Sequence, residues 1–201
     1  MLSHATLVDE IRKIVDPTHP DHHYPTSYAD AAQRWTDAYA TIYAGDAEDY
    51  SGDAVATKND AGCLAILAAN MPSNWTATQA ATMWQNAFEA LWTGGIFGVG
   101  SFGAPGGECP NVGGTMIFSV EISSLVTVVS GATLKIALIP EFNDLSYGDL
   151  EQYGYNKAND LADIFHAHII LLSSLTTLIT GLDTTPPPVG PLPCANTCHI
   201  Y

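Results

Sequence analysis

The feature that most constrains this chain is a long uncharged stretch close to its C-terminus. No Asp, Glu, Lys or Arg occurs from Ile164 to Thr180, and a proline-rich segment, "TTPPPVGPLP", follows shortly afterwards. Three arrangements account for such a pair of segments. They are a membrane anchor, a buried helix followed by an arm that docks on a neighbour, and a chain end clipped by a metal ion.

Polar residues within the uncharged stretch disfavour the membrane anchor. A spanning helix requires about 20 mostly apolar residues, whereas this stretch includes His166, His168 and the polar run "SSLTTLIT". No Lys or Arg follows it to set an orientation across a bilayer. We therefore predict no membrane span, and instead a buried helix that leads into an extended segment.

The proline-rich end is predicted to form a stiff arm. Consecutive prolines favour the polyproline II conformation, whose backbone groups stay exposed. Such a segment loses little conformational entropy on binding, which suits it to docking on another subunit. We predict one helix-rich domain over residues 1–181 and an arm over residues 182–201. The arm residues expected to make contacts are Pro186, Pro187, Pro188, Pro191, Pro193 and Tyr201.

Hydrophobic residues recur at helical spacing in five segments of the chain. Residues 115–122 instead alternate between apolar and polar and predict a strand, whereas residues 123–140 and 173–182 fit either structure. The predicted fold class is mainly α, a bundle of four to five helices with a small β element and long Gly/Pro-rich loops, with α+β as the alternative. The predicted helices are residues 2–15, 27–44, 57–70, 76–93 and 156–172.

Local signals define several of the expected helix ends. Ser27 is a suitable N-cap for the second helix, and Thr76 or Thr78 for the fourth. Pro140 is expected to end the undecided segment. The buried stripe of the second helix is predicted to include Tyr28, Trp35, Tyr39 and Ile42.

A glycine-rich segment over residues 94–114 reads "GGIFGVGSFGAPGGECPNVGG". Its glycine density excludes a regular helix, but its apolar residues distinguish it from an ordinary solvated linker. We predict a loop that lies against another surface. Its expected contact residues are Ile96, Phe97, Val99 and Phe102.

The charge of the chain excludes some partners. A net charge of −15 with six scattered Lys and Arg residues offers no basic patch, so nucleic-acid binding by base or phosphate contacts is not expected. Charged residues make up 13% of the chain, about half the usual share of a soluble domain. A surface with so little charge indicates a subunit that is partly covered by partners.

Two clusters hold residue types that bind metals. His19, His22 and His23 lie in the connector "DPTHPDHHYPT", and Cys194, Cys198 and His199 lie at the C-terminus. Neither shows the spacing of four fixed ligands that a structural zinc site requires, so no metal and no cofactor are predicted. A small metal-binding or carrier module that uses both clusters remains the alternative function.

No catalytic motif is present. The chain has no G-x-S-x-G, no H-E-x-x-H and no acidic calcium loop. "GGIFGVG" follows a predicted helix and lacks the Gly-Lys-Ser/Thr of a phosphate loop. We therefore predict that the protein is not an enzyme.

The order of several segments is similar to that in a known group of proteins. "AFEALWTGGIF" is followed by "VEISSLVTVV", "IALIPEF" and "KANDLADIFHAHI", and the chain closes on "TGLDTTPPPVGPLP" and "HIY". Over roughly its C-terminal two thirds, the chain resembles small virion structural proteins of tailed bacteriophages. The histidine-rich connector and the "CANTC" element are not part of this resemblance.

The resemblance implies a non-enzymatic subunit of the neck, tail or baseplate of a virion. Such a subunit assembles with copies of itself and with other virion proteins. It is made in the host cytoplasm, which is consistent with an N-terminus, "MLSHATLVDEIRKIVD", that lacks the pattern of a signal peptide.

Overall fold

The computed structural model of the chain describes residues 2–47, 55–71, 76–103, 115–121, 124–144, 150–175, 179–183 and 192–196. Only the backbone is described for residue 56, for the strands after residue 95 and for residues 124–126, 150–151 and 173–175. Everything that follows concerns these parts of the chain.

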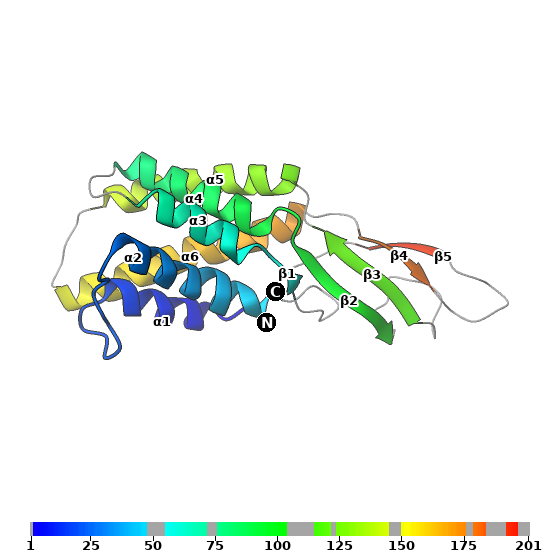
Figure 1. Cartoon of the computed structure of the whole chain (residues 1–201), viewed down its shortest axis with the longest axis horizontal. Coiled ribbons are helices and arrows are strands. Elements are labelled where there is room, and N and C mark those ends of the chain that lie inside the picture. The colour runs from blue at the N-terminus through cyan, green and yellow to red at the C-terminus, as the bar shows by residue number, and fades with distance from the viewer. Residues whose placement is uncertain are drawn as a thin grey trace.

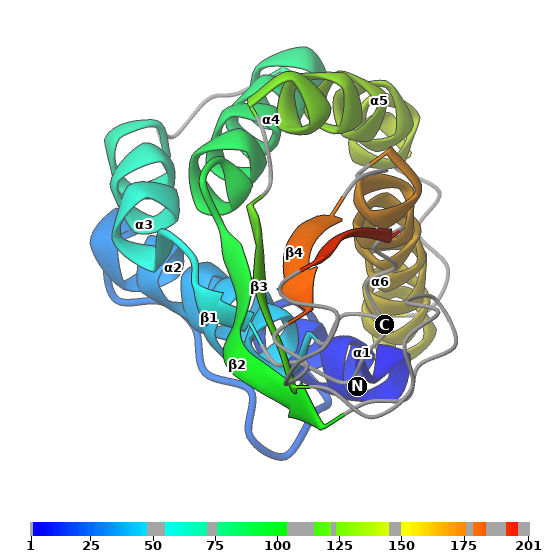
Figure 2. The same ribbon diagram turned by 90° about the vertical axis from the view of Figure 1, so that its right-hand side faces the viewer.

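The fold is mainly α, as predicted (Figure 1). Viewed along the molecule, the helices pack in the spatial order α1, α6, α5, α4, α3 and α2, and α2 returns to α1 (Figure 2). The helices are α1 (His4–Val15), α2 (Tyr28–Thr36), α3 (Asp60–Ala69), α4 (Ala77–Trp92), α5 (Ser124–Asn143) and α6 (Leu150–Leu175), with a π-helix, η1 (Asp37–Tyr43), and a 3₁₀ turn, η2 (Ala44–Asp46), after α2.

Side-chain caps begin several of the helices. The hydroxyl of Ser27 accepts a hydrogen bond from the Asp30 backbone N–H at 3.1 Å, which confirms the predicted cap of α2. Thr76 caps α4 in a reciprocal box with Gln79, the arrangement that satisfies two backbone donors at once. These caps explain why the predicted and observed starts of α2 and α4 agree closely.

The core is an aromatic cluster at the centre of the helical body. Trp84 and Phe165 have ring centroids 4.7 Å apart, and Tyr39 lies 4.9 Å from Phe165. Tyr39, Trp92 and Phe165 are almost completely buried. Because these aromatic side chains come from η1, α4 and α6, the cluster packs three elements of the helical body against one another.

The predicted helix over residues 27–44 is divided, and its buried face agrees with the predicted one only in part. Tyr39 is buried and Trp35 is partly buried, as predicted, whereas Tyr28 and Ile42 are exposed. The second half is the π-helix η1, whose wider turn changes which of its side chains point inward, so that Tyr43 is buried and Ile42 is not.

A five-stranded antiparallel sheet extends from one end of the helical body (Figure 1). Its strand order follows the chain order, and Phe102 of the second strand is opposite Met116 of the third. The strands are β1 (Val55–Thr57), β2 (Ile96–Gly103), β3 (Thr115–Glu121), β4 (Ile179–Asp183) and β5 (Leu192–Asn196). The predicted strand over residues 115–122 is thus confirmed.

Two predicted interruptions are wrong. The first part of the glycine-rich segment is a strand, β2, because β3 pairs with it in antiparallel orientation. The register of this pairing shifts between Phe97 and Gly100, as it does at a β-bulge. Residues 104–114 lie outside the described chain.

Pro140 does not end α5, which continues to Asn143. Pro140 removes one backbone donor, the N–H that would bond to the carbonyl four residues earlier, whereas the N–H groups of residues 141–143 remain available to continue the helix.

The segments that fit either structure are now assigned. Residues 124–143 form helix α5, which adds a sixth α-helix to the five predicted, and α6 continues to Leu175 before the chain becomes extended in β4. Of the predicted arm, residues 192–196 form β5 and pair with β4 of the same chain. The boundary at residue 181 falls within β4.

None of the helices within the described ranges combines the length and the apolar content that crossing a bilayer requires.

Candidate functional site

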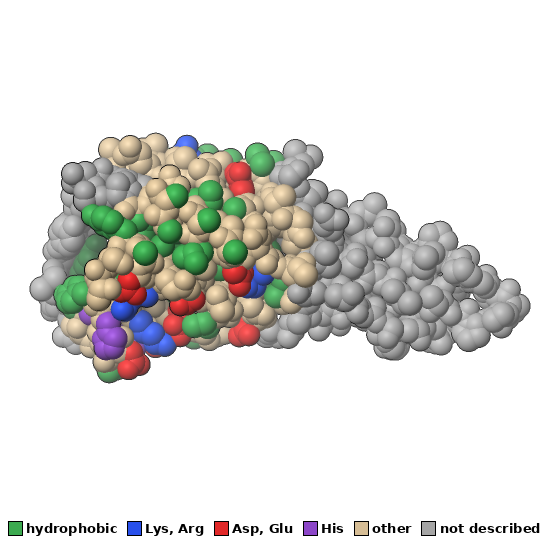
Figure 3. Space-filling model, in the orientation of Figure 1, with side chains coloured by type: hydrophobic (Ala, Val, Ile, Leu, Met, Phe, Trp, Pro, Cys, Tyr) green, Lys and Arg blue, Asp and Glu red, His purple; other side chains and the backbone are tan. Residues whose placement is uncertain are grey.

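Charged residues are distributed unevenly along the chain and over its helices. From Ala61 to Thr133 the sequence holds three charged residues, Glu89, Glu108 and Glu121. This stretch includes nearly all of α3, all of α4 and the first half of α5. On the face shown in Figure 3, hydrophobic and uncharged polar side chains cover the middle of the helical body, and most charged side chains lie along its lower edge.

The outward face of α5 is apolar. Val128, Val129 and Ile136 are 49, 44 and 70% exposed, and Lys135, which is half-buried, borders them. The described residues of α5 that are exposed are Val128, Val129, Ala132, Thr133, Ile136, Pro140 and Asn143, none of them charged. Because Leu134 and Leu138 are fully buried on the other side, α5 has apolar side chains on both its buried and its exposed face, as is typical of a helix covered on both sides.

The outward faces of α3 and α4 continue this surface. Ala61, Ala65, Ala68 and Ala69 are exposed on α3. A pocket of ≈ 370 Å³ lies between the two helices. It is lined by the uncharged residues Ala69, Asn70, Thr78, Gln79, Thr82, Met83 and Asn86.

We define the α3–α5 surface as the exposed residues of α3, α4 and α5. These helices hold four charged residues: Glu89 and Lys135 are half-buried, the Glu141 side chain is 14% exposed, and the Asp60 side chain is 38% exposed. Asp60 is paired with Lys58 at 2.5 Å, and Glu89 accepts a hydrogen bond from Gln85 at 2.9 Å. Apart from Asp60 at the start of α3, the α3–α5 surface therefore exposes apolar and uncharged polar side chains, and in chemical terms it is suited to binding another protein surface.

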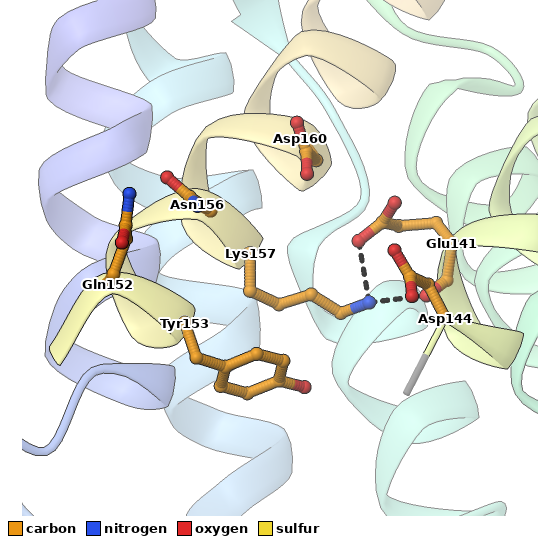
Figure 4. Close-up of a pocket in the computed structure, with 7 residues that line it drawn as sticks. All are labelled: Glu141, Asp144, Gln152, Tyr153, Asn156, Lys157 and Asp160. Carbon is orange, nitrogen blue, oxygen red and sulfur yellow. Dashed lines mark hydrogen bonds and ion pairs between the residues drawn. The ribbon is translucent and has the colours of Figure 1, made fainter. Parts of the chain in front are cut away.

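A second pocket, of ≈ 300 Å³, lies where α5 ends and α6 begins (Figure 4). The amine of Lys157 is 2.6 Å from the carboxylate of Glu141 and also donates to the Glu141 backbone carbonyl. Both side chains are largely buried, with 13 and 14% exposed. Gln152 and Asn156 lie on the opposite side of the pocket from this pair (Figure 4). Lys157 thus satisfies a carbonyl at the C-terminal end of α5, which is a structural role.

A cluster of polar side chains lies between α1, η1 and α6. The hydroxyl of Tyr43 is hydrogen-bonded to Nδ1 of His166. The rings of His166 and His4 meet edge to face with centroids 5.6 Å apart, and Nε2 of His4 lies 2.7 Å from Oδ1 of Asp163. Burial raises the pKa of Tyr43 above its usual value, so its hydroxyl stays protonated at neutral pH.

Mild acid is expected to lower the free energy of unfolding through His166. Burial, and then the nearby His4, lower the pKa of His166, and the charge of Asp163 only partly opposes this. The unfolded chain takes up the proton near pH 6.5, so the stability contributed by the neutral ring is present above that pH and is lost below it, as the pH falls through the folded pKa. Urea denaturation at about pH 7.5 and about pH 5.5 measures the loss.

Two variants identify the source of this pH dependence. His166→Gln is expected to reduce the dependence, because glutamine does not titrate. His23→Gln is the matched control, since His23 is exposed and should leave the dependence unchanged. An equal pH dependence in the parent chain and in His166→Gln would show that the assignment to His166 is wrong.

Two histidines of the connector, His19 and His22, make contacts with α1. Nε2 of His19 is 3.2 Å from the carboxylate of Asp9, and Nδ1 of His22 is 3.0 Å from the Lys13 carbonyl. His23 is exposed. Within the described part of the chain, no three His, Cys, Asp or Glu side chains are arranged to hold a metal ion.

The other predicted site residues lie on two different strands or outside the described residues. Ile96, Phe97, Val99 and Phe102 lie on β2, and Pro193 and Cys194 lie on β5, opposite Leu182 and Gly181 of β4. These contact predictions stay predictions, since only the backbone is described at these positions. Those outside the described residues are Pro186, Pro187, Pro188, Pro191, Cys198, His199 and Tyr201.

Sequence reasoning did not find the α3–α5 surface. Two signals point to it: the near absence of charge from Ala61 to Thr133, and a segment, Ser124 to Asn143, whose apolar residues do not gather on one side. The polar group around His166 has no such signal, because His4, Tyr43 and His166 lie far apart in the sequence.

Comparison with protein-family models, with curated proteins and with solved structures gives no match for this chain.

Proposed function

We propose that this chain is a non-enzymatic structural subunit that assembles through the α3–α5 surface with copies of itself and with other proteins. One observation carries the proposal: a chain with a net charge of −15 presents three neighbouring helices with four charged residues, of which Asp60 is paired with Lys58 and Glu141 with Lys157. Charged faces of like sign repel one another, so an uncharged apolar face is where such subunits meet at the lowest electrostatic cost. Exposed apolar side chains lie on α3 and α5, on either side of the uncharged polar residues Thr78, Gln79 and Asn86 of α4, and exposed apolar patches mark interaction sites.

The setting of the assembly is part of the same proposal. The resemblance of the C-terminal two thirds to tailed-bacteriophage structural proteins supports a place in the neck, tail or baseplate of a virion. No observation on the described residues favours the metal-binding alternative, so we do not advance it as a second function.

A single added charge tests the proposal. In light scattering after size exclusion, the parent chain is expected to be oligomeric, and Ile136→Glu is expected to weaken the association at least about tenfold, because each interface would bury an unpaired carboxylate. Gln152→Glu adds the same charge at an exposed position of α6 and should leave the oligomer intact. A parent chain that remains monomeric throughout a concentration series would overturn the proposal.

A further inference from the structure

We infer that two copies of this chain pair through antiparallel α5 helices about a two-fold axis at Ala132. This inference rests on the proposed function and deepens it by naming the partner and the register of the contact. Its starting point is the outward face of α5, whose exposed residues Val128, Ala132 and Ile136 are spaced four apart. Residues with this spacing lie above one another on one side of a helix.

The pattern of this face is self-complementary. Ala132 is the small residue at the centre, and larger apolar residues, Val128 and Ile136, lie one turn away on each side. In an antiparallel pair with its axis at Ala132, Val128 of one copy meets Ile136 of the other, and the reverse contact follows by symmetry. The small side chain of Ala132 allows the two helix axes to approach within the usual 8–10 Å.

Charge identifies the occupant as a second copy. Every copy is strongly acidic, so two copies repel one another wherever carboxylates face each other. The exposed residues of α5 carry no charge, and Lys135, which borders them, is one of only six basic residues in the chain. A face without carboxylates and with a lysine at its edge lets two acidic chains meet, whereas a basic partner would find no anionic group there to bind.

The register is tested by disulfide formation at the axis. A disulfide requires Cβ atoms about 3.5–4.5 Å apart, a condition that a residue and its own symmetry mate meet only close to the two-fold axis. Ala132 is exposed and Ala132→Cys is a small change, so the fold should be retained. We expect most of this variant to form a covalent dimer under mild oxidation, and mass spectrometry should show the peptide with the substitution linked to a second copy of itself. The parent chain, treated in parallel, accounts for links between native cysteines.

Two further variants test the direction of the helices. Ile136→Cys alone should not link to itself, because its mate lies two turns away across the axis. A mixture of Val128→Cys and Ile136→Cys should link the two different chains. Self-linking of Ile136→Cys without linking of Ala132→Cys would overturn the antiparallel pairing.

The outcomes separate this inference from the proposed function. A parent chain that is oligomeric in light scattering, but whose Ala132→Cys variant and mixed variants form no specific link, overturns the α5 pairing and leaves the proposed function standing. A parent chain that is monomeric in the same measurements overturns both. Oligomeric parent chains with both predicted links support the pairing.

Discussion

Replacing Asp16 with Ala is expected to lower the free energy of unfolding by about 3 kcal/mol, because the substitution leaves a partly buried cation and other donors without their acceptor. Asp16 is completely buried at the end of α1. Its carboxylate accepts hydrogen bonds from Arg12 at 2.9 Å and from the hydroxyl of Thr18 at 2.6 Å. It therefore joins the end of α1 to the start of the connector. Urea denaturation followed by circular dichroism measures the change.

Asp30 provides the matched control for Asp16. It also pairs with an arginine four residues away, Arg34, at 3.1 Å, but 28% of the Asp30 side chain is exposed, so water competes for its charge. Asp30→Ala should therefore cost far less stability than Asp16→Ala. Equal losses in the two variants would show that burial of Asp16 is not what makes its ion pair important.

Acid should remove the contribution of Asp16. Burial acts against its charge, yet the hydrogen bonds from Thr18 and Arg12 outweigh this and hold its pKa below the usual value. The folded chain thus binds this proton less readily than the unfolded chain. The stabilisation is present above the ordinary carboxyl pKa and is lost as the pH falls through the lowered one.

Helices were predictable where a cap and a one-sided apolar stripe agree. α4 has both, and Thr76 begins it close to the predicted position. α5 lacks the one-sided stripe, because its apolar residues lie on more than one side of the helix and include many β-branched side chains. Its helical state follows from packing between α4 and α6, which is a tertiary effect that overrides local propensity.

The glycine-rich strand illustrates the opposite limit. Glycine is disfavoured in strands, and β2 contains Gly98, Gly100 and Gly103. The segment is extended because β3, which lies beyond residue 114 in the sequence, pairs with it. Such a pairing partner is not encoded in the local pattern.

The candidate site was only partly readable from the sequence. The low share of charged residues predicted a surface that partners cover, and this stays a prediction. The location of a surface with little charge depends on which helices are neighbours. α3, α4 and α5 present one continuous uncharged surface because they are adjacent in the ring of helices (Figure 2). The stretch with few charges can be seen in the sequence, but the packing of α3, α4 and α5 side by side cannot.

Replacing Gly154 with Ala is expected to lower the free energy of unfolding by about 2 kcal/mol, although the same change within a helix usually stabilises it by about 1 kcal/mol. Gly154 lies in α6, where an added Cβ would be 2.6 Å from the Cα atom of Asp16. That backbone is held in place, since the Asp16 N–H donates to the Arg12 carbonyl at 2.8 Å. The clash therefore moves whole helices, not a side chain. Chemical denaturation gives the size of the loss.

Gly131→Ala is the matched control, because it makes the same change in another buried helical glycine. An added Cβ at Gly131 would lie 2.7 Å from Oε1 and 2.9 Å from Cγ of Glu89, and this side chain can move without any shift of the backbone, at the cost of its hydrogen bond from Gln85. The gain in helix propensity should then offset much of the cost, and the net change should stay within about 1 kcal/mol. If Gly154→Ala proves as stable as the parent chain, α1 and α6 do not approach as closely as described here, and the burial of Asp16 between them loses its structural basis.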